Sequence, residues 1–86
     1  MAAMAVVAGC SDHPATVIDG SSPEAFRRTT VQARRDLSDA DRLVFDRALK
    51  TIGGRRYSAK DPAALARVTF NGMTGAQVVE DQRARD

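Results

Sequence analysis

Signals for the start of a helix recur along the chain and divide it into short segments. The four signals are Ser22-Pro23-Glu24, Ser38 with Asp41, Asp61-Pro62, and Thr74 with Gln77. Each is typical of a helix N-terminus, where a side-chain oxygen accepts a hydrogen bond from a backbone N–H group. The sequence therefore predicts an all-α fold, a small bundle of three to four short helices that follows a flexible N-terminal tether.

Glycines mark the expected helix ends. Gly53-Gly54 should end the second helix as a left-handed cap, and Asn71-Gly72 should end the third. The break around Ser38 is short, so the first two helices should form an antiparallel hairpin. The expected core residues are Phe26, Leu37, Phe45, Leu49, Ile52, Leu65 and Phe70. The end of the last helix, residues 81–86, should fray because few apolar residues lie near it.

The chain is short and its charges are balanced. Among 86 residues, 13 are basic and 11 acidic, which leaves a net charge of +2. Opposite charges stand four residues apart in Glu24/Arg28, Arg42/Asp46 and Asp46/Lys50. Such spacing places them on adjacent helical turns, as on a solvated surface. The expected helical domain, residues 22–86, is near the lower size limit for folding alone, so a homodimer could supply further core.

The first ten residues are apolar or small and end at the only cysteine, Cys10. The general pattern is that of a secretory signal and its cleavage site. Val7-Ala8-Gly9-Cys10 resembles the lipobox of bacterial lipoproteins. The resemblance implies a signal peptide over residues 1–9, cleavage before Cys10, and lipid attachment to the Cys10 thiol. One cysteine also excludes an intramolecular disulfide.

Two interpretations of the start remain open. A complete signal carries a basic region before its apolar segment, and neither Lys nor Arg precedes Cys10. Either a basic segment is encoded upstream of Met1, or the stretch is the start of an Ala-rich helix with Cys10 as a buried apolar residue. Residues 10–21 are expected to be the lipidated cysteine and its tether, with His13 as a solvated residue of the tether.

A wider resemblance covers most of the chain. Ile18-Asp19-Gly20-Ser21, followed by Ser22-Pro23-Glu24-Ala25-Phe26, resembles a family of short bacterial lipoproteins of unknown function. These have a lipobox, a polar linker, an Ile-Asp-Gly-Ser motif and a small helical body. The likeness extends to Leu37-Ser38 and Asn71-Gly72-Met73-Thr74. It implies a lipid bilayer as partner through acylated Cys10, with an envelope protein as a possible second partner. Residues 19–21 also fit a purely structural turn before a capped helix.

The resemblance implies a place in the bacterial cell envelope, facing the periplasm. Ser11, rather than aspartate, follows the lipidated position, which favours the outer membrane over the inner one. The alternative is a soluble intracellular helical protein that binds an anionic partner such as nucleic acid. Its basis is three arginine pairs, Arg27-Arg28, Arg34-Arg35 and Arg55-Arg56, the last beside Tyr57. The small net charge makes nucleic acid the less favoured partner.

An enzyme is the least favoured class. Cys10 and His13 could form a thiol and base, but no third group is placed to orient them. Gly53-Gly54 and Gly72-Met73-Thr74-Gly75 lack the spacing of a phosphate-binding loop. We therefore expect no catalytic residue, no cofactor, no metal and no small-molecule substrate.

Overall fold

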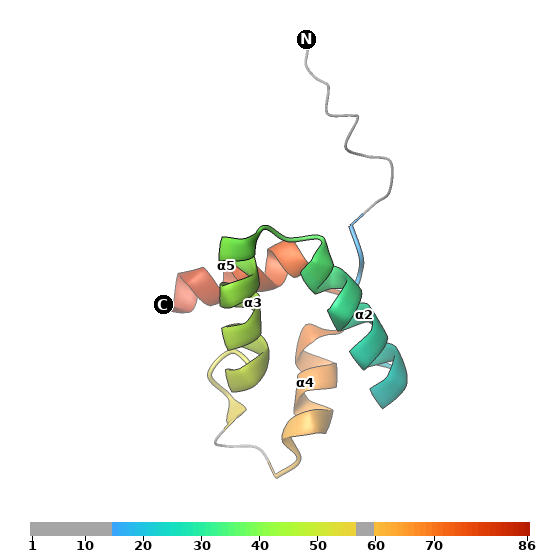
Figure 1. The fold of residues 1–86 in the computed structure, drawn as a ribbon. Coiled ribbons are helices and arrows are strands. Elements are labelled where there is room, and N and C mark those ends of the chain that lie inside the picture. Colours follow the sequence, from blue (N-terminus) through green and yellow to red (C-terminus); the bar gives the residue numbers. More distant parts are fainter. Residues whose placement is uncertain (1–14, 57–59) are drawn as a thin grey trace.

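The computed structural model describes residues 15–56 and 60–86. In these ranges the chain forms α2 (Pro23–Arg35), α3 (Asp39–Thr51), α4 (Pro62–Phe70) and α5 (Gly75–Arg85) (Figure 1). The predicted all-α fold with short helices is confirmed. No helix in the described part of the chain is long and apolar enough to cross a membrane.

All four predicted N-caps are present. In each, the cap side chain accepts a hydrogen bond from a backbone N–H group in the first helical turn. The pairs are Ser22 with Ala25, Ser38 with Asp41, Asp61 with Ala64, and Thr74 with Gln77. At Thr74 the bond is reciprocated, because the Thr74 N–H donates to Gln77 Oε1 at 2.9 Å. These local bonds fix where each helix begins.

The helices pack around α3 and α5. α2 and α3 both run downward from the short loop that joins them and splay apart, while α4 lies between their separated ends in the view of Figure 1. The most extensive packing joins α3 to α5. At the crossing of α2 and α5, a Cβ atom on Gly75 would lie 2.8 Å from the Ala33 carbonyl oxygen. The expected hairpin of α2 and α3 is thus opened by the two later helices.

One apolar core joins all four helices. Phe45, Ile52 and Phe70 are fully buried, as expected. The other four expected core residues, Phe26, Leu37, Leu49 and Leu65, are partly buried and pack against it. Val78 and Val79 complete the core from α5.

The segment before α2 departs from the expected tether. Ile18 is 1% exposed and belongs to the core. Its N–H donates to the Met73 carbonyl at 2.8 Å, and its own carbonyl accepts from the Gly72 N–H at 2.8 Å. Val17 forms an isolated antiparallel bridge with Thr74. The folded body therefore starts near Thr16 instead of Ser22, because the connection before α5 offers backbone partners that only the tertiary fold brings close.

Two helix ends also differ from expectation. α3 ends one residue earlier than predicted, with Ile52 itself in the left-handed conformation (φ 53°) before Gly53 (φ 60°). α5 stays helical to Arg85 in place of fraying. Its end is held by ion pairs to α3, from Arg83 to Asp41 at 2.7 Å and from Arg47 to Asp86. Charge pairing replaces the apolar contacts that the end of α5 lacks.

Candidate functional surface

The predicted lipid-attachment residue lies outside the described residues. Cys10 and His13 precede them, and Tyr57 falls in the gap between residues 56 and 60. The described chain becomes part of the folded body at Thr16, whose N–H donates to Asp36 Oδ2 at 2.9 Å. An attachment at Cys10 would therefore be six residues from the body.

The Ile-Asp-Gly-Ser motif has a structural role. Asp19 Oδ1 accepts the Ser21 N–H at 2.9 Å, which closes a turn just before α2. Hydrogen bonds from Ser21, first through its hydroxyl and then through its N–H, hold the pKa of Asp19 below its usual 3.8. The Gly20 N–H donates to Asn71 Oδ1 at 2.7 Å. A Cβ atom on Gly20 would lie 2.1 Å from the Arg67 carbonyl oxygen, so only glycine fits beside α4.

The structure separates the arginine pairs. Arg34 forms a two-pronged ion pair with Asp46 of α3, at 2.8 Å from Nε and 2.9 Å from Nη2. These hydrogen bonds lower the pKa of Asp46. Arg42 donates to the Arg34 and Arg35 carbonyls, both at 3.0 Å, and so caps the end of α2. Asp46 and Arg42 thus connect α2 to α3, a role that their spacing along α3 did not predict.

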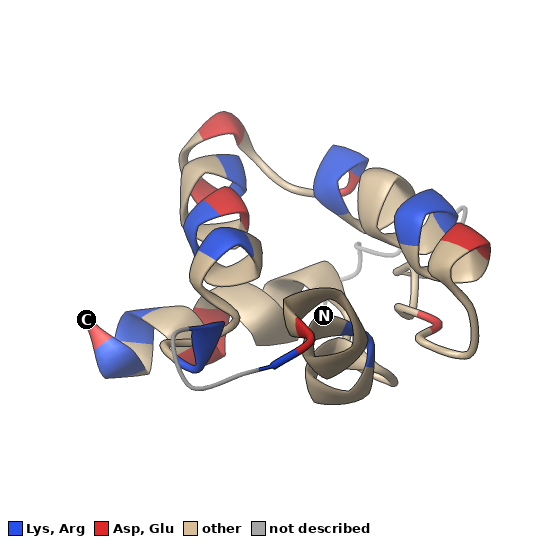
Figure 2. Cartoon of the chain, turned by 90° about the horizontal axis from the view of Figure 1, so that it is seen from below, with Lys and Arg blue, Asp and Glu red and all other residues tan. Residues whose placement is uncertain are grey.

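The remaining arginines of α2 gather on its outer face. A shallow groove runs over this face and is lined by Thr16, Glu24, Arg27, Arg28, Thr29, Val31, Gln32 and Arg35. Arg27, Arg28 and Arg35 are exposed, and their guanidinium groups make no hydrogen bond or ion pair within the described residues. Figure 2 shows basic positions along α2, with acidic positions near its ends. We call Arg27, Arg28, Val31 and Arg35 the α2 outer face.

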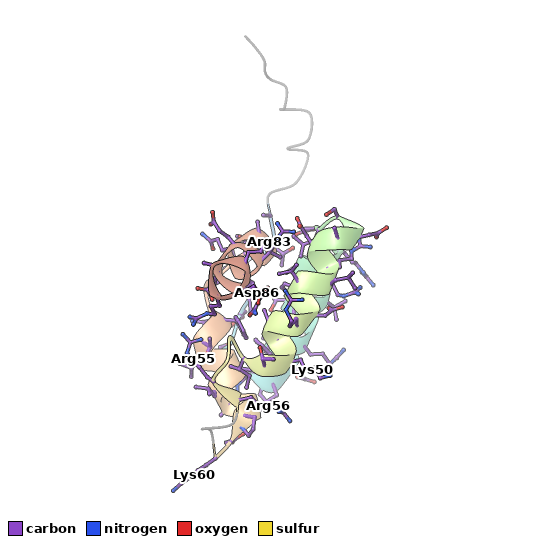
Figure 3. The ribbon with its side chains drawn as sticks, turned by 90° about the vertical axis from the view of Figure 1, so that its left-hand side faces the viewer. Lys50, Arg55, Arg56, Lys60, Arg83 and Asp86 are labelled. Atoms are coloured by element: carbon purple, nitrogen blue, oxygen red, sulfur yellow. The ribbon has the colours of Figure 1, made fainter. Side chains whose placement is uncertain are left out.

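A second group of basic residues lies where α3 leads toward α4. Figure 3 labels Lys50, Arg56 and Lys60 at that end of the molecule, below Arg83 and Asp86. All three side chains are exposed. The neighbouring Arg55 turns back to its own chain, because its Nη1 donates to the Ile52 carbonyl at 3.4 Å. The Arg55-Arg56 pair is therefore divided between a loop contact and an exposed position.

A buried amide lies near the end of α5. Gln82 is 6% exposed; its Nε2 donates to Asp86 Oδ1 at 2.9 Å, while its Oε1 has no hydrogen-bond partner among the described residues. The hydrogen bond from Gln82, followed by that from Arg47, lowers the pKa of Asp86. Within residues 15–56 and 60–86, no three His, Cys, Asp or Glu side chains gather as metal ligands would. The Gln82–Asp86 contact instead joins the end of α5 to α3 through Arg47.

Comparison of the chain with known proteins identifies no relative. Models of known protein families, curated proteins and solved structures all give no match. The arguments for function accordingly come from the chain itself: the Val7-Ala8-Gly9-Cys10 pattern and the surfaces of the helical body. Arg28 and Arg35 stand seven residues apart, and this spacing alone indicates that they share one face of a helix. It could not predict that Thr16 lies beside them.

Proposed function

We propose that the chain is a membrane-anchored bacterial lipoprotein whose small helical domain faces the periplasm and serves a structural or interaction role. The observation that carries the proposal is the sequence Val7-Ala8-Gly9-Cys10. An aliphatic residue, two small residues and a cysteine provide what the lipidation and cleavage steps require next to the modified residue. The thiol accepts the diacylglycerol group, and the small residues let the chain lie extended in a narrow peptidase site.

The energetics of acylation explain how a small domain stays at a membrane. Each buried acyl methylene contributes about 0.8 kcal/mol, so one chain binds weakly and two or three bind firmly. The short distance between Cys10 and the body is consistent with this use, since Thr16 already belongs to the fold. In the proposed protein Cys10 is consumed by the anchor, which accounts for a single cysteine in an exported chain.

The domain itself is proposed to act by contact and not by turnover. The outer membrane is the favoured location, because Ser11 rather than aspartate follows Cys10. Leu43 and Val68 are exposed apolar residues, at 69% and 76%, on α3 and α4. Either could contribute to an envelope protein contact or to a homodimer.

The proposal is tested by replacing Cys10. The chain, expressed with its native upstream region in a bacterium that matures lipoproteins, is compared with Cys10→Ser and with the control Ser11→Ala. Wild type and Ser11→Ala should incorporate labelled palmitate and partition into the detergent phase, whereas Cys10→Ser should do neither. Equal partitioning of all three chains without label would contradict the anchor.

The alternative function is binding of an anionic partner by a soluble chain. The observation that favours it is the trio Arg27, Arg28 and Arg35, which carries exposed charge without ion-pair partners in the described part of the chain. Binding of nucleic acid through such residues should weaken steeply as salt rises. A shallow salt dependence, or no binding at low salt, removes this alternative.

A further inference from the structure

We infer that the α2 outer face, formed by Arg27, Arg28, Val31 and Arg35, lies against the anionic phospholipid headgroups of the membrane to which the chain is anchored. The inference rests on the proposed lipid attachment at Cys10 and adds to it an orientation of the helical body. Three observations support it: the reach of the chain, the chemistry of this face and the position of the other basic residues.

The reach of the chain keeps the body close to its anchor. Thr16 lies six positions after Cys10, and a fully extended chain spans about 3.3–3.6 Å per residue. Thr16 therefore stays within about 20 Å of a lipidated Cys10. The Thr16 N–H is bonded to Asp36 at the end of α2, and Thr16 lines the same groove as the α2 outer face. Among the surfaces of the body, this one adjoins the point where the anchoring chain arrives.

The chemistry of this face suits a headgroup layer. Its three arginines are exposed, and none of them forms an ion pair within 4 Å among the described residues, although Arg28 lies close enough to Asp19 to help lower its pKa. The groove has one acidic residue in its lining, Glu24. Val31, 44% exposed, lies among the arginines, and Val17, 54% exposed, is next to Thr16. Basic and aliphatic residues on one helix face are typical of helices that lie at a membrane surface.

The second group of basic residues provides a matched control for the arginines of the α2 outer face. Lys50, Arg56 and Lys60 carry the same charge as the three arginines and are also exposed. They lie at the end of α3 and before α4, at the opposite end of the body from the described start of the chain, which is drawn blue in Figure 1 (Figures 1 and 3). Electrostatic attraction falls off within about 10 Å at ordinary ionic strength, so proximity to the anchor decides which group contacts the headgroups.

The test uses the single cysteine to impose the anchor chemically. The full chain, labelled with ¹⁵N, is coupled through Cys10 to a maleimide lipid in nanodiscs of phosphatidylcholine, with or without phosphatidylglycerol as the anionic lipid. A gadolinium chelate on a lipid headgroup broadens the NMR signals of nearby backbone amides. The variants are Arg27→Gln/Arg28→Gln/Arg35→Gln and, with the same charge loss, Lys50→Gln/Arg56→Gln/Lys60→Gln.

The inference predicts broadening centred on α2 residues 27–35, present with phosphatidylglycerol and reversed by high salt. The triple α2 variant should lose it, and the Lys50/Arg56/Lys60 variant should keep it. Each removed arginine is expected to weaken the contact about fivefold, from about 1 kcal/mol per basic residue near an anionic surface. The measurement at high salt uses the wild-type chain, so it tests the inference even if the triple α2 variant folds poorly.

Four results would overturn the inference. Broadening centred on Lys50 and Lys60 would place another surface at the membrane, and broadening spread evenly over the body would show that no face is preferred. Broadening unaffected by salt would show that the arginine charges do not hold the contact. A stronger response of the α2 signals to a DNA oligonucleotide than to anionic nanodiscs would assign the face to nucleic acid. Because the maleimide supplies the anchor, these results are independent of whether cells acylate Cys10.

Discussion

Replacing Gly20 by alanine should remove most of the stability of the domain. Gly20 packs against the backbone of α4, and an added Cβ would lie 2.1 Å from the Arg67 carbonyl oxygen and 2.8 Å from its carbon. No side-chain rotation can relieve this overlap, because the obstructing atoms belong to a helix backbone. The segment before α2 would have to move, together with the Gly20 N–H bond to Asn71.

The magnitude follows from these contacts. Overpacking against a rigid neighbour costs about 3 kcal/mol at the upper end of its usual range. The strained Asn71 bond adds about 1 kcal/mol. Alanine also leaves the unfolded chain less conformational freedom than glycine does, which offsets about 0.5 kcal/mol of this loss. The net loss of about 3.5 kcal/mol compares with about 3–5 kcal/mol expected for the whole domain. At about 4–8 °C per kcal/mol, Tm should fall by about 14–28 °C.

Thermal unfolding followed by circular dichroism measures this loss. Gly54→Ala is the matched control: no described atom lies within 4 Å of its added Cβ, but its φ of +89° strains alanine. That strain costs about 1–2 kcal/mol, so Gly54→Ala should fall between wild type and Gly20→Ala. A Tm for Gly20→Ala at or above that of Gly54→Ala would refute the close packing of the motif against α4.

Further predictions concern the core, a cap and an ion pair. Ile18→Ala should cost about 2–5 kcal/mol in urea unfolding because Ile18 is fully buried, while Val17→Ala should change stability little. Thr74→Ala should cost about 1 kcal/mol by breaking the capping box of α5; an unchanged urea midpoint would contradict that bond. Arg34 lowers the pKa of Asp46. The pair's stabilisation is therefore present above the unfolded pKa near 3.8 and is lost as pH falls through the folded pKa. Asp46→Asn should reduce stability by at most about 1 kcal/mol at neutral pH and make no difference in strong acid, as unfolding at both pH values would reveal.

The sequence predicted the helix starts well because each depends on residues that are neighbours in the chain. Ser22, Ser38, Asp61 and Thr74 cap the helices they were expected to cap. A cap is a local hydrogen bond, so the information lies within three or four residues. The core was predicted for a similar reason, since apolar spacing determines one face of a helix before any packing occurs.

The missed features depend on partners distant in the chain. Nothing around Ile18 has helical or strand period, yet its backbone pairs with the connection before α5. Asp46 pairs with Arg34 on another helix, although Arg42 and Lys50 stand closer in sequence. The helical end of α5 likewise depends on Arg47 and Asp41 from α3. Such contacts arise from tertiary packing, which short-range spacing does not encode.

The lipid anchor is a different case, because its prediction depends on the covalent chemistry expected at Cys10 rather than on packing. If the proposal holds, the Val7-Ala8-Gly9-Cys10 pattern gives both the cleavage position and the modified atom. The folded body, starting near Thr16, adds a constraint that the pattern alone did not contain, namely a short chain between the proposed anchor and the domain. Together they lead to the arrangement proposed above, with the helical body held near a membrane surface.

The central claim is tested most directly by the intact mass of the chain after detergent extraction from bacterial membranes, following expression with its native upstream region. The account predicts a polypeptide that starts at Cys10 and carries the added mass of acyl chains. An unmodified soluble polypeptide that still starts at Met1, from a host able to mature lipoproteins, would contradict it.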